Sequence, residues 1–289
     1  MTGKGIGDVQ GNFLSNLNIS SSSGIMPGLR GEVAVARRAA ILAAAGALAL
    51  AGCVQTRQVA DVEFQPPQGS YSLIVMRPDV QVGSVTAGGM VEPRAEWSEQ
   101  ARRNVLEALR AQQAGRGGRT VIAERRDSIS GVDPKLVADL ERLHNAVGNS
   151  IALHKYFGAE LPTKRRQGVD WTLGEDAVRL GRATGMDYAL FLYAQDSIAS
   201  TERVALQVLG IAGCFVGFCA PQGGGGQVAY ASLVDLRTGD VVWFNVLQTG
   251  SQLPGMSFGD IRTPEGSTQM VERLLGRMKA GRNVRDHAR

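Results

Sequence analysis

The 289-residue chain is poor in the residues that build metal sites and reactive centres, with three cysteines and three histidines. The single Gly-x-Ser-x-Gly match, at 255–259, does not directly join an expected strand to a helix, as the nucleophile elbow of a hydrolase does. His144 and His154 are too far apart for the helix-face spacing of a zinc protease, and no carboxylate motif completes a site. We therefore predict no metal, no cofactor and no catalysis.

The chain also lacks a comfortable membrane span near its N-terminus. Residues 39–51 form an apolar run after Arg37 and Arg38. As a helix, these 13 residues rise only about 20 Å, against a hydrocarbon core of about 30 Å. A basic flank, a short apolar core and small residues at its end are what a signal peptidase reads. The run therefore predicts a cleaved targeting segment and not a membrane domain.

The apolar run ends in Leu50, Ala51, Gly52 and Cys53. These four residues resemble the lipobox of bacterial lipoproteins, in which the peptidase cuts before the cysteine and the thiol carries a diacylglycerol. An ordinary secretory peptide with a cysteine near its cut is the alternative. The resemblance implies that Cys53 is the acylated first residue of the mature chain. It also implies sorting to the outer membrane, facing the periplasm, because Val54 and not Asp follows the cysteine.

Composition divides the chain into five segments. Residues 1–25 are rich in Gly, Ser and Asn and lack an export pattern, so Met26 is the better start. Pro66 and Pro67 break regular structure in the stretch that follows Cys53. The expected segments are a start-site artefact or disordered lead at 1–25, a signal peptide at 26–52, a lipidated tether at 53–70, one periplasmic α/β domain at 71–280 and a basic tail at 281–289.

The charge of the mature chain is close to neutral. Residues 1–52 hold four of the 31 basic and two of the 27 acidic residues, which leaves 27 basic and 25 acidic residues. Nucleic-acid binding would call for a clustered basic face. We therefore expect no nucleic-acid partner.

Hydrophobic periodicity predicts a mixed α/β arrangement. The segment at 80–93 is Gly-rich and is expected to be a loop, with an edge strand considered at 81–85. Alternation on both sides of the turn 237–239 predicts an antiparallel hairpin. The expected strands lie at 71–76, 119–123 and 188–193, the hairpin at 227–246, and the helices near 97–109, 134–153, 174–184 and 264–278. The order of elements indicates a single domain with a mixed sheet.

Residues 204–220 do not fit this pattern, because they are nearly uncharged and interrupt two strands. Either they are an exposed segment that meets a bilayer, a protein partner or a second copy, or they are a buried part of the core. The glycines at 223–226 lack the Lys-Ser/Thr tail of a phosphate loop and are expected to be a flexible linker. The candidate interaction residues are Val208, Leu209, Ile211, Phe215, Val216 and Phe218.

Cys214 and Cys219 are the two cysteines that remain beside Cys53. Their spacing is neither the Cys-x-x-Cys of a redox enzyme nor a zinc hook with partners nearby. A structural disulfide or two buried thiols are the expected states in an oxidising compartment.

Two stretches, at 174–192 and 231–243, resemble the curli-secretion lipoprotein (CsgG-like) superfamily and the N-terminal domain of TolB. The first is a helix that ends before Gly185-Met-Asp-Tyr188 and enters a strand, and the second is a hairpin with Val234-Asp-Leu-Arg-Thr-Gly239. The resemblance implies an anticodon-binding-domain-like α/β fold used in envelope assembly, export or scaffolding. The pore of the secretion channel is not implied, because residues 204–226 lack the alternation of a barrel strand.

The sequence thus favours a lipid-anchored envelope protein that binds protein partners or a second copy of itself, without catalysis. The alternative is a periplasmic enzyme whose site is assembled from scattered residues.

The anchor at Cys53 can be tested by substitution. Cys53→Ser removes the thiol that would carry the diacylglycerol, so it should abolish metabolic lipid labelling and release the protein from the membrane fraction. A lipid-labelled Cys53→Ser protein would show that the anchor lies elsewhere.

Overall fold

The computed structural model describes residues 55–59, 71–114, 118–159, 161, 170–214, 217, 223–250, 259–276 and 278. All of them belong to one compact unit, Cys53–Arg289. The predicted signal peptide, the lipobox and the basic tail at 281–289 lie outside the described residues.

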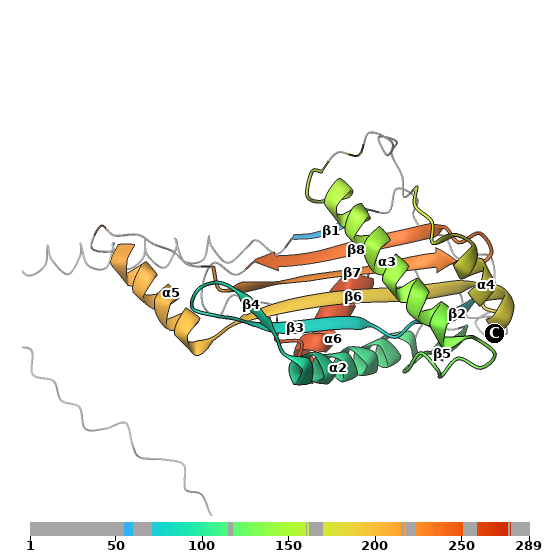
Figure 1. The fold of residues 1–289 in the computed structure, drawn as a ribbon, viewed down its shortest axis with the longest axis horizontal. Coiled ribbons are helices and arrows are strands. Elements are labelled where there is room, and N and C mark those ends of the chain that lie inside the picture. The colour runs from blue at the N-terminus through green and yellow to red at the C-terminus, as the bar shows by residue number, and fades with distance from the viewer. Residues whose placement is uncertain are drawn as a thin grey trace, which may run out of the picture. The chain divides into compact units, whose positions relative to one another are not determined.

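An eight-stranded mixed sheet forms the centre of this unit (Figure 1). Its path runs β1-β8-β7-β6-β2-β5, while β3 pairs with β6 and β4 pairs with β3. The strands are β1 (Gln55–Val59), β2 (Ser72–Val75), β3 (Asp79–Val85), β4 (Val91–Pro93), β5 (Arg119–Ile122), β6 (Tyr188–Ala199), β7 (Gly225–Asp235) and β8 (Val241–Gly250). The described helices are α2 (Ala95–Ala114), α3 (Pro134–Lys155), α4 (Gly174–Thr184), α5 (Thr201–Cys214) and α6 (Pro264–Leu275).

The strand β6 organises the sheet. Along one edge it pairs in parallel with β2 at its start and with β3 at its end, from Leu73 opposite Tyr188 to Val85 opposite Ala199. Along the other edge it is antiparallel to β7 over 11 residue pairs. The expected mixed α/β sheet with an antiparallel hairpin is therefore confirmed.

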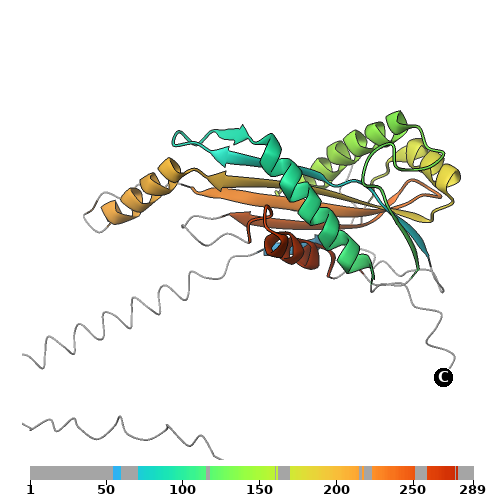
Figure 2. The same ribbon diagram turned by 90° about the horizontal axis from the view of Figure 1, so that it is seen from below.

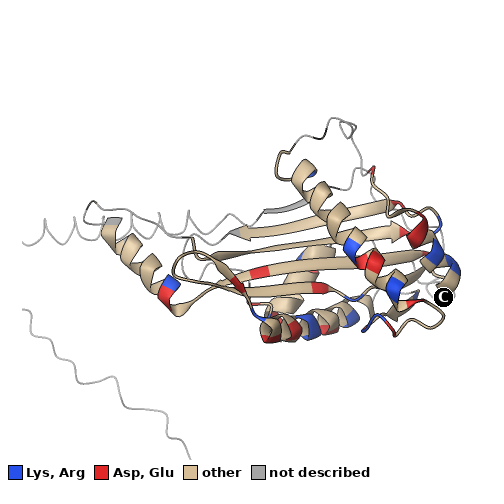
Figure 3. Cartoon of the chain, viewed as in Figure 1, with Lys and Arg blue, Asp and Glu red and all other residues tan. Residues whose placement is uncertain are grey.

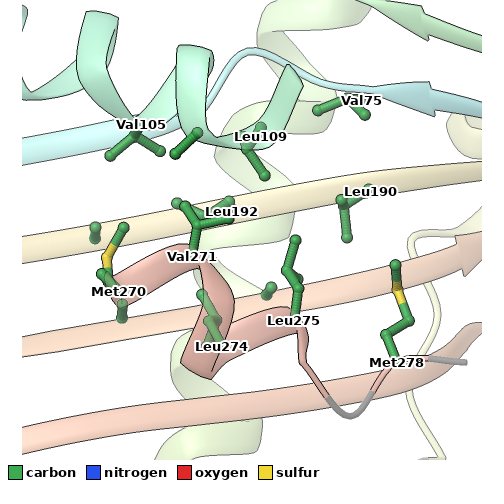
Figure 4. Packing of buried hydrophobic residues seen from close by; sticks show 14 of the residues in the cluster. Val75, Val105, Leu109, Leu190, Leu192, Met270, Val271, Leu274, Leu275 and Met278 are labelled. Atoms are coloured by element: carbon green, nitrogen blue, oxygen red, sulfur yellow. The ribbon is translucent and has the colours of Figure 1, made fainter. Parts of the chain in front are cut away.

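Helices cover both faces of the sheet. The helices α2 and α6 lie on one face and α3 and α4 on the other (Figure 2). Charged residues concentrate on the outer surfaces of α2, α3 and α4 (Figure 3). Because successive side chains of a strand point to opposite faces, Leu190 and Leu192 join the α2/α6 core, whereas Phe191 and Tyr193 join the α3/α4 core. Figure 4 shows the first of these cores, where Leu274 and Leu275 of α6 meet the strands.

Local residue types account for the helix ends. The Asp133 carboxylate accepts a hydrogen bond of 2.8 Å from the Lys135 amide at the start of α3, and Pro134 takes the first position. The Thr263 hydroxyl accepts from the Gly266 amide at 3.1 Å and caps α6 in the same way. The helix α4 ends at Gly185, which has a left-handed φ of 63°.

The strand considered at 81–85 is present as part of β3, although it lies between β6 and β4 and not at an edge. The loop expected for the rest of 80–93 is wrong at β4, which pairs with β3 to form a hairpin. Val80 and Val82 are buried against α2, so the alternation that places them there was present in the sequence. Gly83 interrupts this alternation in the sequence. A Cβ at this position would lie 2.6 Å from a methyl group of Val91, so the close pairing of β3 and β4 requires a glycine.

The first strand lies inside the segment predicted to be a tether. Residues 55–59 pair with β8, from Gln55 opposite Gln248 to Val59 opposite Phe244. Five residues of the segment 53–70 therefore belong to the sheet, and Val54 alone separates them from Cys53.

Candidate interaction surface

The predicted interaction segment begins as α5, which extends beyond the end of β6 in both views (Figures 1 and 2). Its apolar side chains are exposed: Val204 by 36%, Leu206 by 40%, Val208 by 53% and Leu209 by 66%. These four side chains are not part of the core, so the buried alternative does not apply to them. An exposed apolar patch is typical of an interaction site.

Polar groups hold α5 to the rest of the protein. Gln207 is buried, with 1% of its surface exposed, and a Cβ added to Gly224 would lie 2.3 Å from its side-chain nitrogen. The Arg203 guanidinium donates to the carbonyl oxygens of Gly223 (2.9 Å) and Ala87 (3.0 Å). The helix thus turns a polar side inward and apolar side chains outward, the reverse of a helix that packs on its own core.

The glycines at 223–226 are part of this attachment and not a flexible linker. The strand β7 begins at Gly225, opposite Ile198. Gly225 has a φ of 113°, and a Cβ there would lie 1.9 Å from the Ser197 carbonyl oxygen. Only glycine fits this approach.

Several predicted residues cannot be placed. Phe215, Val216, Phe218 and Cys219 lie outside the described residues, as do Leu50, Ala51, Gly52 and Cys53. Ile211 and Cys214 belong to α5, but their side chains are not described. The lipid anchor and the disulfide therefore stay predictions.

A hollow of about 440 Å³ lies beside the base of α5. Gln195, Val228 and Gln248 line it, two residues beyond Tyr193, Tyr230 and Val246 of the α3/α4 core on the same strands. They therefore share the face that α3 covers elsewhere. Gln195 and Gln248 are exposed, so the hollow is open.

Arg203 is the one ionisable residue among the described residues that line the hollow. The sequence prediction missed this site because it ended the strand at Tyr193, where the apolar run stops. The alternation of Gln195 and Ser197 beyond that point was the available signal, and Ser197 also lines the hollow.

The two described histidines, His144 and His154, make contacts that belong to the fold. His144 is buried in the α3/α4 core, stacks on Phe191 at 4.7 Å between ring centroids and forms a hydrogen bond with the Ser232 hydroxyl. Burial lowers its pKa to about 3, so the ring is neutral. His154 Nδ1 lies 2.9 Å from the Ala159 carbonyl oxygen. Within the described part of the chain, no group of three or more His, Cys, Asp or Glu side chains could hold a metal ion.

Two aspartates, Asp187 and Asp235, hold the ends of strands in place. The Asp187 carboxylate accepts hydrogen bonds of 2.8 Å from both the amide and the hydroxyl of Ser72, which ties the start of β2 to β6. Asp235 accepts from the amide and the guanidinium of Arg237 in the β7–β8 turn. Neither Asp187 nor Asp235 is among the described residues that line the hollow.

Asp196 is the one acidic residue of β6, and it lies opposite the hollow, on the α2/α6 face. Burial raises the pKa of its carboxyl to about 6, and the nearby Asp260 adds to this effect. Hydrogen bonds from Gln227 and from the Ile261 amide oppose the shift. The pKa of this carboxyl is therefore raised because the loop before α6, with Asp260 and Ile261, shields it from solvent.

Comparison with known proteins gives only distant likenesses. The sequence matches no family model and no curated protein. Among solved structures, the PelC dodecamer from Paraburkholderia phytofirmans aligns over 79% of this chain and 99% of that chain, at 12% identity and a TM-score of 0.34. Lipoprotein GNA1162 from Neisseria meningitidis aligns over 63% and 84%, at 13% identity and a TM-score of 0.25.

The LpoB C-terminal domain from Salmonella enterica aligns over 66% of this chain and 90% of that domain, at 13% identity and a TM-score of 0.23. Scores of this size establish neither a shared fold nor a shared function. The resemblance to the curli-secretion superfamily stays a prediction. Of the described helices, none combines the length and the apolar character needed to cross a bilayer.

The raised pKa of Asp196 predicts a pH dependence of stability. The folded protein holds this proton at higher pH than the unfolded chain, so the free energy of unfolding should fall as pH rises from about 4 to about 6, by roughly 1.4 kcal/mol for each unit of pKa difference. Asp196→Asn, which cannot ionise, should remove this dependence in urea titrations across that range.

Asp235→Asn is the matched control. Burial alone would raise the pKa of Asp235, but the hydrogen bonds from Arg237 hold it below its usual value. Its stabilising effect is lost only as pH falls below about 4. The difference in the free energy of unfolding between wild type and Asp235→Asn should therefore stay constant between pH 4 and 7. If the free energy of unfolding changed equally with pH in wild type and Asp196→Asn, the raised pKa of Asp196 would be contradicted.

Proposed function

We propose that the protein is a lipid-anchored envelope protein, held at the outer membrane by Cys53 and facing the periplasm, which acts by binding protein partners and not by catalysis. The observation that carries this proposal is the α3 face at the end of the sheet, which no described helix covers and where the hollow lies beside the base of α5. The middle of the sheet, where β6, β7 and β8 contribute to both cores, is covered by helices on both faces. A binding surface is therefore expected at this end.

The lining of the hollow favours a protein partner over a small molecule. Small-molecule sites enclose most of their ligand in a largely apolar cavity. Here the side-chain amides of Gln195 and Gln248 face solvent in an open hollow. Such groups form the hydrogen bonds that are typical of the polar parts of protein interfaces.

The rim of the hollow supplies apolar contacts. Met90, in the β3–β4 turn, is 73% exposed, and Val91, which lines the hollow, is 46% exposed. Methionine adapts its shape to irregular surfaces and is common where proteins bind partners. Polar amides beside an exposed Met and Val match the composition of a protein-binding surface.

The alternative of an enzyme finds less support. A catalytic site would gather ionisable groups of perturbed pKa in a cleft. The described lining residues of the hollow include one ionisable side chain, Arg203, and its guanidinium is bound to backbone carbonyl oxygens.

Site-specific photocrosslinking in membranes tests the binding proposal. A photoreactive amino acid at Gln195 or Gln248 should give discrete protein adducts, whereas the same residue at Lys135, an exposed position on α3 outside the hollow, should not. Equal adduct patterns at all three positions, or none at Gln195 and Gln248, would contradict a partner at the hollow.

A further inference from the structure

The described surface of α5 is apolar around much of the helix. At about 100° per residue, the exposed side chains of Val204, Leu206, Val208 and Leu209 spread over roughly 200° of its circumference. Gln207 points to the remaining side, where the protein buries it. Beyond its first turn, with Glu202 and Arg203, the helix carries no charged residue (Figure 3). A helix with so wide an apolar surface requires an apolar environment.

The N-terminus of the sheet lies at the same end as α5. One row of paired residues crosses the sheet here, since Gln55 of β1 pairs with Gln248, Gln248 with Val228, and Val228 with Gln195. From Gln195, β6 runs on to its end at Ala199, and α5 starts at Thr201. From Gln55, β1 runs in the opposite direction, because it is antiparallel to β8.

The predicted acylation site is therefore close to this end. Cys53 precedes Gln55 by two residues, and two residues of extended chain span at most about 7 Å. A long tether would allow the lipid to lie anywhere around the protein. The pairing of β1 with β8 instead limits the lipid on Cys53 to the end of the sheet where Gln55 pairs with Gln248.

We infer that the exposed apolar side chains of α5 enter the lipid bilayer that holds the acyl chains of Cys53, so that the protein contacts the membrane at two points. The inference rests on the lipid anchor of the proposed function. The occupant is lipid because the anchor brings a bilayer to this end of the sheet, while no second protein is brought there by the chain itself.

The dimensions of α5 fit insertion into one leaflet. Its 14 residues are about 21 Å long, which is too short for a hydrocarbon core of about 30 Å. Interfacial helices bury an apolar face by about 5–10 Å at the boundary between headgroups and acyl chains. The charged first turn, bound to the protein by Arg203, stays at the headgroups while the uncharged turns enter the lipid.

Two contacts with the membrane would fix an orientation that one acylated residue cannot. Acyl chains provide nearly permanent attachment but leave the protein free to rotate about its anchor. With α5 inserted, the hollow at its base is held next to the bilayer surface. A partner of the hollow would then have to reach it at the membrane.

Photocrosslinking to lipid tests this inference on the full-length, acylated protein in vesicles of phosphatidylethanolamine and phosphatidylglycerol (3:1). A photoreactive residue at Leu209 should give phospholipid adducts at about tenfold or higher yield than the same residue at Leu153, a matched leucine on α3 that is 52% exposed. Val208→Asp should reduce the adduct at Leu209 by about tenfold, because it places a charge in the apolar surface.

The experiment distinguishes a failure of the lipid anchor from a failure of α5 insertion. Metabolic acyl labelling of Cys53, measured on the same samples, reports the anchor alone. Labelled Cys53 combined with protein adducts only at Leu209 would overturn the insertion of α5, identify a protein partner or a second copy as the occupant, and leave the anchor standing. Unlabelled Cys53 would overturn the anchor, and equal lipid yields at Leu209 and Leu153 would overturn the insertion in either case.

Discussion

The rest of the structure depends on the burial of β6 on both of its faces. Its first seven residues are buried, and β2, β3 and β7 satisfy its backbone along both edges. Leu190 and Leu192 point to one helical layer, and Phe191 and Tyr193 to the other. A strand in such an environment must be apolar on both sides, which is why this part of the chain is a continuous apolar run.

On one face of the sheet, the layer of α3 and α4 ends before β6 does. Gln195 is the first exposed residue of β6, and the strand continues to Ala199. Because α3 does not cover this part of the sheet, polar side chains replace apolar ones on that face, and the hollow forms there. The uncovered length of β6 also carries α5 away from both cores. The candidate surface is thus a direct consequence of a sheet that is longer than the helices packed on it.

Much of the fold could be predicted from the sequence, because its signals were local. The Asp133-Pro134 cap, the stop at Gly185 and the alternation around the 237–239 turn each specified an element where it was found. Of the β3–β4 hairpin, only a strand at 81–85 was considered, because the need for Gly83 in close strand pairing is not visible in one segment alone. The first strand was missed for a similar reason: residues 55–59 become a strand only through β8, which is distant in the sequence.

The candidate surface was predictable only in part. The uncharged segment after Arg203 marked α5, but its exposure depends on where the strands end. The exposure of Val208 and Leu209 agrees with their choice as candidate interaction residues, whereas the burial of Gln207 was not predicted. The hollow is built from Gln195, Val228 and Gln248 on three strands, and their proximity follows from register and not from any motif.

The central claim is that the end of the sheet that carries α5 is the end that meets the membrane. Hydrogen–deuterium exchange of the acylated protein on vesicles, compared with soluble Cys53→Ser protein, tests it most directly. The account predicts slower exchange in α5 on vesicles and unchanged exchange in α2 and α4. Unchanged exchange in α5, with protection confined to α2 or α4, would contradict it.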